Sequence, residues 1–345
     1  MITRFHAENY GCLRNVDVEL TPIHALIGPN DSGKSTILNG IRTLAQLASG
    51  PFTGSFDHRL NVEGGVPNIV LSGIGRSGEY SLTATEDKLI ETGSDAAGRR
   101  ASNRGRRQNQ PSQLLSDRLV PGAAEMDAVL GTMSGARFIR FDPEALRGAS
   151  GLIPESQATA FLDDRGQGLP GVYQVIQGRG DDSFRELTVE IRRLFPTVKL
   201  VRVTPISTHA LEIQVELKDG TRVRAHQMSE GLLYYLAFAA IPSLSEVSFL
   251  LVEEPENGLH PARIADVMKV LRRVSLKTQV IIATHSPLVI NCLEPNEVSV
   301  VTRPSLEQGT EVKLIRDTPN FSERSEVYAL GELWLSYADG QFEKP

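Results

Sequence analysis

The spacing of apolar positions changes between helical and strand periods along this chain, and the changes predict an α/β fold. Near the N-terminus an apolar run at 23–27 ends at Gly28, and apolar residues then recur at helical spacing from Ile37 to Ala48. The last third predicts helix 232–241, strand 247–252, helix 261–274, strand 279–284 and strand 297–302. The continuously apolar strand 249–252 is typical of a sheet with helices on both faces.

Two other regions predict antiparallel β structure. Short strands at 68–74, 80–85 and 88–92 are separated by turns. A hairpin follows in the middle of the chain, where apolar residues alternate over 211–217 and Asp219-Gly220 forms the turn. Residues 137–141 predict another strand, and residues 155–195 are expected to be mostly helical. We therefore expect one domain over 1–345, with an antiparallel β subdomain near 65–92 and an inserted α+β lobe at 150–225.

The stretch 93–116 has a different character, because it carries five arginines, a single acid and few large apolar residues. This composition predicts a mobile loop. Arg99, Arg100, Arg104, Arg106 and Arg107 are candidates for contacts with DNA or RNA phosphates. A solvated loop or a partner-docking segment is the alternative, and it is slightly favoured. No aromatic residue lies among the arginines, which argues against a base-stacking platform.

Composition and charge narrow the class of protein. Of 345 residues, 40% are hydrophobic and 23% are charged, so the chain is long and apolar enough for a real core. The net charge of −6 argues against a generally basic nucleic-acid coat. Two cysteines, Cys12 and Cys292, exclude a disulfide scaffold and fit a reducing compartment. Without a spanning apolar segment or a signal core, we expect a soluble cytoplasmic protein with no membrane contact.

A phosphate loop is predicted between the first buried strand and its helix. Residues 28–36 read GPNDSGKST and fit G-x-x-x-x-G-K-[ST]. In such loops backbone N–H groups turn toward a triphosphate, helped by the positive end of the helix dipole. Lys34 supplies a charge for the β- and γ-phosphate oxygens, and Ser35 is a ligand for Mg²⁺. The nucleotide-binding candidates of this loop are Asn30, Asp31, Ser32, Gly33, Lys34, Ser35 and Thr36.

Carboxylates follow the apolar strand 249–252. Such groups lie at the ligand-binding edge of a parallel sheet, where one holds the metal and the next activates water. We assign Glu253 to Mg²⁺ and Glu254 to the attacking water. The alternative is that these acids only solvate the end of a strand. Beside a phosphate loop, the functional interpretation is favoured.

Three further segments carry weaker signals. Ser229 precedes an apolar helix and is either an ordinary N-cap or part of an anion site at the helix start. Residues 257–261 are a polar connector close to Glu254, and Pro261 suits a first helical turn. His285 follows the strand ending at 283, where it either contacts a γ-phosphate or has a structural role.

In this order, the motifs resemble the ABC-type ATPase heads of the SMC/RecF class. The resemblance is strongest to the ATPase domain of OLD (overcoming lysogenization defect) proteins and covers residues 1 to about 300. The segments that carry it are FHAENYGCLRNVDVEL, GPNDSGKST, MSEG, FLLVEEPENGLHP and ATHSP. The resemblance implies a P-loop NTPase fold with an ABC-type head, a central mixed sheet flanked by helices, and ATP and Mg²⁺ as ligands.

The resemblance also implies a homodimer with two ATP molecules between the heads. One protomer would supply the phosphate loop and the acidic strand, and the other would supply Ser229 and Gly231. Asn257 and Gly258 would lie at the dimer seam, and His285 would be the switch histidine. The implied activity is Mg²⁺-dependent ATP hydrolysis in antiphage defence or DNA maintenance. Only about 40 residues follow position 302, so we expect no TOPRIM nuclease domain and a separate nuclease or toxin effector.

The sequence departs from the general ABC pattern in three ways. Glu253 stands where most ABC ATPases have Asp, although the OLD branch commonly carries Glu. No glutamine-loop residue is evident near 137–142, and no long coiled coil separates the two nucleotide motifs. Two other functions compete with an ATP-hydrolysing switch: a scaffold that binds nucleotide without hydrolysing it, and a transporter ATPase subunit. A turnover assay with Mg²⁺ tests the first, and fractionation with an integral membrane partner tests the second.

Overall fold

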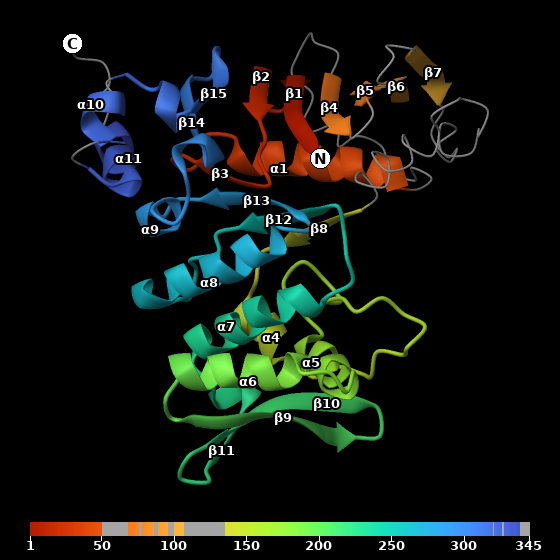
Figure 1. Cartoon of the computed structure of the whole chain (residues 1–345), viewed down its shortest axis with the longest axis vertical. Helices are drawn as coiled ribbons and strands as arrows, with labels where there is room; N and C mark the ends of the chain where they lie inside the picture. The colour runs from red at the N-terminus through yellow and green to blue at the C-terminus, as the bar shows by residue number, and fades with distance from the viewer. Residues whose placement is uncertain are drawn as a thin grey trace. The chain divides into compact units, whose positions relative to one another are not determined.

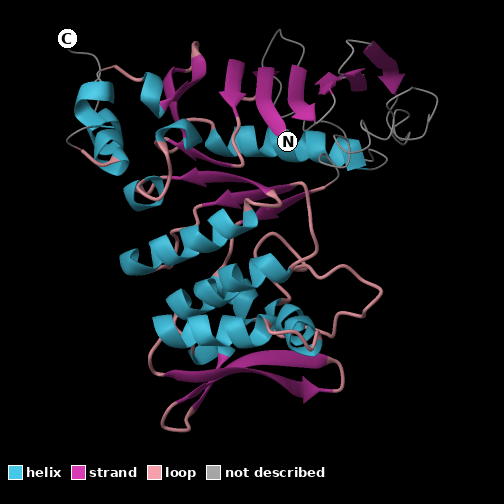
Figure 2. Cartoon of the chain, in the orientation of Figure 1, coloured by secondary structure: helices cyan, strands magenta, loops and turns pink. Residues whose placement is uncertain are grey.

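The computed structural model of the chain describes residues 1–49, 68–75, 78–85, 89–95, 100–106, 135–319, 321–325 and 328–338. They belong to two compact units (Figure 1). The first unit consists of 1–138, 247–254 and 275–345, and the second of 139–246 and 255–274. The α/β class is confirmed (Figure 2). The lobe predicted at 150–225 falls within the second unit.

The first unit contains a mixed sheet with the strand order β15-β14-β3-β13-β12-β8. Its strands are β3 (Ile23–Ile27), β8 (Ala136–Ile139), β12 (Phe249–Glu253), β13 (Gln279–Thr284), β14 (Val298–Ser305) and β15 (Gly309–Leu314). The three central strands β3, β13 and β12 are parallel and almost wholly buried. The continuously apolar sequence 249–252 of β12 reflects burial on both faces, as predicted.

A second, antiparallel sheet of the first unit has the order β2-β1-β4-β5-β6-β7. Its strands are β1 (Ile2–Tyr10), β2 (Leu13–Glu19), β4 (Asn68–Gly75), β5 (Gly78–Thr85), β6 (Leu89–Asp95) and β7 (Arg100–Arg106). Helix α1 (Lys34–Ser49) buries Ile37, Ile41 and Leu44 in one apolar cluster with side chains of both sheets. The core of this unit therefore lies around α1, and the packing fixes the start of the helix beside the ends of β3, β12 and β13.

The loop predicted for 93–116 is wrong in part, because 100–106 form strand β7, paired antiparallel with β6. The sequence of β7 has no alternation of apolar and polar residues, so its pattern does not predict a strand. It lies at an edge of the sheet, where backbone pairing to a single neighbour suffices and charged residues are tolerated. Residues 96–99 and 107–116 of the predicted loop, with Arg99 and Arg107, lie outside the described residues.

The remaining elements of the first unit are short. They are the helices α9 (Pro287–Ile290), α10 (Phe321–Ser325) and α11 (Leu330–Ala338), and the 3₁₀ turns Pro295–Glu297 and Ile315–Asp317. Across the described part of the chain, no helix is long and apolar enough to cross a membrane.

The second unit packs helices around α7 (Glu230–Ala240), which is buried along nearly its whole length. The surrounding helices are α4 (Pro143–Arg147), α5 (Leu169–Gly178), α6 (Ser183–Leu194) and α8 (Pro261–Val274). A three-stranded sheet, β11-β10-β9, consists of β9 (Val198–Ser207), β10 (Ala210–Leu217) and β11 (Arg222–Arg224). Two 3₁₀ turns, Ala225–Gln227 and Ile241–Ser243, flank α7.

Two of the sequence predictions for this unit are confirmed, and one is wrong in part. The hairpin turning at Asp219-Gly220 and helix 261–274 are confirmed. The region 155–195 is helical only from Leu169 onward, because the preceding segment carries Gly, Pro and closely spaced polar residues. Asp142 caps α4 by accepting a hydrogen bond from Ala145 N at 3.0 Å, so its place in the fold is that of an N-cap.

His24 in β3 gives the fold a pH dependence. The ring is wholly buried, with Nε2 2.9 Å from Ser299 Oγ and Nδ1 3.1 Å from Thr21 Oγ1. Burial lowers the pKa of His24 to about 4, partly opposed by the charge of Glu297. The unfolded chain then binds the extra proton between pH 6.5 and about 4, so stability is full above this window and lost as the pH falls through it.

We expect unfolding free energy to fall by roughly 2 kcal/mol from this group between about pH 7 and about pH 5. Urea titrations of the wild type and His24→Gln at both pH values measure it. Glutamine retains polar atoms but takes up no proton, so the variant should show a correspondingly smaller pH dependence. Equal pH dependence in both proteins would contradict the assignment.

Candidate functional site

The site of the first unit is built where three parallel strands end side by side. In the sheet register Ile27 of β3 lies opposite Thr284 of β13, and Ala283 of β13 lies opposite Glu253 of β12. The phosphate loop, the acidic segment and His285 therefore leave the sheet at the same edge. This edge is where parallel α/β sheets bind their ligands.

Glycine is required at both ends of the phosphate loop. A Cβ on Gly28 would lie 2.0 Å from the carbonyl oxygen of Val301. Gly33 has φ +108°, and a Cβ there would lie 2.4 Å from Thr310 Oγ1. Asp31 also has a positive φ, +62°, so the backbone curls tightly before α1 begins. Asn30 and Asp31 are exposed at the tip of this curl, whereas Ser32 is buried at its base.

Lys34 lies against the loop that precedes it. Its Nζ donates hydrogen bonds to the carbonyl oxygens of Gly28 at 2.9 Å and Pro29 at 2.7 Å, and the residue is 6% exposed. Since Lys34 is also the first residue of α1, its positive charge lies at the positive end of the helix dipole. The arrangement concentrates positive potential where the sequence predicted the triphosphate.

Ser35 and Glu253 meet although 218 positions separate them. The hydroxyl of Ser35 donates a hydrogen bond to Glu253 Oε1. Hydroxyl and carboxylate oxygens are hard ligands of the kind that Mg²⁺ prefers, usually together with phosphate oxygens and water. The two predicted metal ligands are thus adjacent and chemically suited to Mg²⁺. In the described ranges, no group of three or more His, Cys, Asp or Glu side chains is arranged to hold a metal, so a Mg²⁺ ion at Ser35 and Glu253 would take its other ligands from phosphate and water.

Glu254 and His285 form the second pair of the site. Glu254 Oε1 lies 3.6 Å from His285 Nε2, and the two side chains are 26% and 34% exposed. Glu254 has φ +50°, which is unusual for a residue with a side chain, and its N–H donates to Ala283 O at 2.8 Å. Backbone strain and this hydrogen bond turn the carboxylate out of the strand direction, into a position that water reaches.

Two residues that the sequence analysis did not assign to the site support the loop. Thr310 of β15 donates from Oγ1 to Ser32 O at 2.7 Å, and its N–H donates to Cys12 O at 3.0 Å. Cys12 Sγ in turn lies 3.5 Å from Thr36 Oγ1. These contacts close the space beside Gly33. They arise from long-range packing, so no local pattern could have indicated them.

The other predicted site residues belong to the second unit. Ser229 is the N-cap of α7, with Oγ accepting from Leu232 N at 3.4 Å, and it is exposed although the helix behind it is buried. Gly258 has φ +68°, and a Cβ there would lie 2.3 Å from Tyr234 Cε2. The carbonyl oxygen of Gly258 also lies near Gly231, since a Cβ on Gly231 would be 3.5 Å from it. The start of α7 and the 257–260 loop therefore form one surface.

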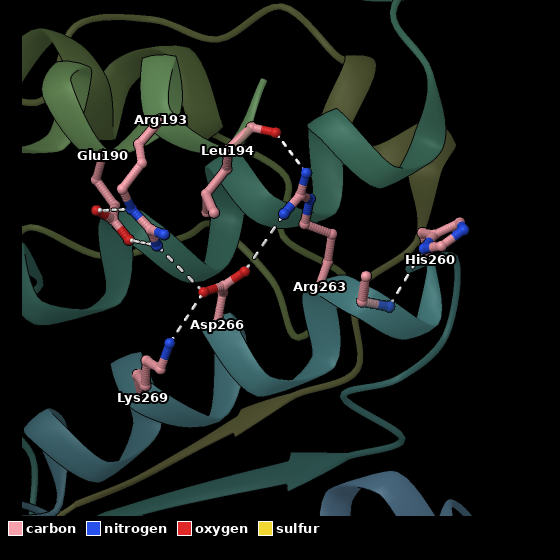
Figure 3. Close-up of polar contacts among 8 residues, drawn as sticks. Glu190, Arg193, Leu194, His260, Arg263, Asp266 and Lys269 are labelled. Carbon is pink, nitrogen blue, oxygen red and sulfur yellow. Dashed lines mark hydrogen bonds and ion pairs between the residues drawn. The ribbon is translucent and has the colours of Figure 1, made fainter. Parts of the chain in front are cut away.

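Helix α8 is anchored behind that surface (Figure 3). Asp266, with its side chain 8% exposed, forms ion pairs with Arg193 at 3.2 Å, Lys269 at 3.3 Å and Arg263 at 3.5 Å. At the beginning of the helix, His260 Nδ1 accepts a hydrogen bond from Ala262 N at 3.2 Å. These contacts join α8 to α6 and hold the 257–260 loop at its end.

Comparisons with known proteins agree with the class of protein that the motifs predicted. Residues 23–291 match the family model described as "AAA domain, putative AbiEii toxin, Type IV TA system". The matched segment contains the phosphate loop, the acidic strand and His285, and it covers most of the chain. The chain belongs to this AAA family.

Among solved structures, the fold of this chain is similar to that of SMC heads. An SMC head bound to the C-terminal winged-helix domain of ScpA is 15% identical with a TM-score of 0.56, over 90% of this chain and 96% of that one. A Pyrococcus furiosus SMC head with an extended coiled coil, bound to the C-terminal domain of ScpA, is 14% identical with a TM-score of 0.52, over 94% of this chain and 99% of that one. At such identities the likeness shows the fold alone.

A curated relative adds a sequence link. The OLD nuclease of Thermus scotoductus is 44% identical over 41 residues, which is 12% of this chain and 8% of that nuclease. The match therefore spans a small part of that protein. The AAA family match, the SMC-head fold and this short sequence match all support the resemblance to ABC-type ATPases of the SMC/RecF/OLD class that the sequence motifs predicted.

Proposed function

We propose that this protein binds and hydrolyses ATP with Mg²⁺, and that it acts as a dimeric switch for a separate effector. The observation that carries the proposal is the convergence of Lys34, Ser35, Glu253, Glu254 and His285 at one sheet edge. The reaction is ATP + H₂O → ADP + phosphate. The OLD link favours antiphage defence or DNA maintenance as the setting, with a nuclease or toxin as effector.

Different residues of the chain have different roles in binding and hydrolysing ATP. Lys34 and the N–H groups of residues 28–36 bind and orient the phosphates, with Lys34 exchanging its loop carbonyls for phosphate oxygens. Ser35 and Glu253 hold Mg²⁺, which when bound neutralises charge on the phosphates. Glu254 orients water and accepts its proton, and His285, 3.6 Å away, holds that carboxylate and contacts the γ-phosphate side of the site.

The second unit supplies the reason to propose a dimer. Ser229 and Glu230 are exposed at the N-terminus of a buried helix, where free N–H groups attract an anion. We infer that Ser229 and Gly231 of one protomer complete the ATP site of the other, with Asn257 and Gly258 at the seam. The contact of Gly258 with Tyr234 would then couple the seam to the start of α7.

Phosphate release with and without Mg²⁺ tests the activity. We expect the wild type to hydrolyse ATP only with Mg²⁺, and Ser35→Ala to need a higher Mg²⁺ concentration because one oxygen ligand is lost. Ser305→Ala, an exposed serine on β14, is the control and should match the wild type. ATP binding without turnover in the wild type would favour the non-hydrolysing scaffold instead.

A further inference from the structure

A groove of about 460 Å³ lies on the second unit, between α6 and β9. Its helical wall includes Phe184, Arg185, Val189 and Arg192, and its other wall is the consecutive stretch 200–204 of β9. In Figure 1, α6 runs alongside this strand. None of these residues belongs to the nucleotide site proposed above.

The strand wall of the groove is a sheet edge. In the three-stranded sheet β9 pairs with β10 on one side and occupies the end of the order β11-β10-β9. Pro205, which cannot donate to a ladder, lies within β9, as expected for an edge strand. An edge strand presents N–H and C=O groups to a further strand. The groove therefore offers backbone pairing as well as side-chain contacts.

The two faces of β9 differ chemically along the groove. Val201 and Val203 lie opposite Val215 and Ile213 of β10, on the apolar face of the sheet, where Val201 is buried and Val203 is half-buried. Arg202 lies on the other face. An added strand would place successive side chains on these faces in turn. Apolar residues of that strand would meet Val203 and the apolar side chains of the α6 wall, Phe184 and Val189, and the residues between them would meet Arg202.

Arginines on both walls of the groove favour acidic residues in the added strand, since Arg202 faces the second set and Arg185 and Arg192 lie on the α6 wall. Arg185 lies 3.1 Å from Asp182, Arg202 lies 2.6 Å from Glu216, and Arg192 donates to the carbonyl of Lys199. A guanidinium carries five N–H donors, so each of the three has donors beyond these bonds for an incoming carboxylate. Val189, 58% exposed on α6, is an apolar contact that the same segment would cover.

We propose that the β9 edge binds an extended segment of a partner protein in which apolar and acidic residues alternate, added to the sheet as a further strand. A phosphate backbone fits less well, since it would leave Phe184 and Val189 uncovered and would not use the strand edge. The proposal is independent of ATP hydrolysis.

Fluorescence anisotropy with the full chain tests the proposal. The probe is a labelled, capped peptide of alternating Val and Glu, and the comparison ligands are a Val-Lys peptide, a Val-Glu peptide with alternate N-methylated amides, and single-stranded oligothymidylate. We expect the Val-Glu peptide alone to bind. Arg185→Glu combined with Val189→Asp should weaken binding by about tenfold or more. Arg222→Glu, an exposed charge reversal on β11 outside the groove, should leave binding unchanged.

Hydrogen exchange measured on the same complex locates the peptide. We expect slower exchange over 198–207 when the Val-Glu peptide is bound, because strand addition protects edge amides. Three results would each overturn the proposal: no Val-Glu binding at roughly 1 mM peptide, equal binding by the groove variant and the wild type, or displacement of the peptide by oligothymidylate at the same groove. Both altered side chains are exposed, so circular dichroism should show a folded variant.

Discussion

Glu254→Gln is expected to lower ATP turnover by roughly 10²–10⁴-fold while ATP binding is retained. The carboxylate lies at the water-accessible edge of the site beside His285, and glutamine cannot accept the proton of the attacking water. Its amide has nearly the same shape, so the backbone turn at residue 254 should persist. Single-turnover and steady-state phosphate release, together with direct ATP titration, separate the chemical step from binding.

Glu307→Gln is the matched control for that variant, because it makes the same change at an exposed turn between β14 and β15. It should hydrolyse ATP at the wild-type rate. A Glu254→Gln protein with a wild-type rate would assign proton acceptance to another group and would remove Glu254 from the catalytic set.

Lys34→Ala is expected to weaken ATP binding on the order of 10²-fold, corresponding to about 3 kcal/mol. The variant loses a positive charge at the start of α1 and the two hydrogen bonds that tie the side chain to Gly28 and Pro29. Isothermal titration with ATP measures the change. Lys313→Ala, an exposed lysine on β15, is the control and should bind ATP as the wild type does. Unchanged affinity in Lys34→Ala would mean that the loop does not bind the phosphates.

The parts of the site that depend on residues close together in the sequence could be predicted from the sequence. The apolar strand before Gly28, the helix after the phosphate loop and the apolar strand before Glu254 were all confirmed as elements, because strand, loop and helix signals are short-range. The sheet order that brings Ser35 to Glu253 follows from the parallel α/β rule, once each strand end carries a polar motif.

Other parts of the fold depend on contacts between distant segments. Cys12 and Thr310 close the phosphate loop through backbone pairing that no window of sequence encodes. Strand β9 was not predicted, since Lys199, Arg202 and Pro205 break its apolar alternation and only pairing with β10 makes it a strand. Strand β7 was missed for the same reason, because an arginine-rich edge is stabilised by its neighbour.

The central claim is that two copies of this chain bind ATP between them, and sedimentation velocity of Glu254→Gln tests it most directly. With ATP and Mg²⁺ the account predicts a dimer, and with ADP or without nucleotide it predicts a monomer. Adding Ser229→Arg should keep the protein monomeric with ATP bound, because the exposed start of α7 would be blocked. A Glu254→Gln protein that is saturated with ATP and remains a monomer would contradict the claim.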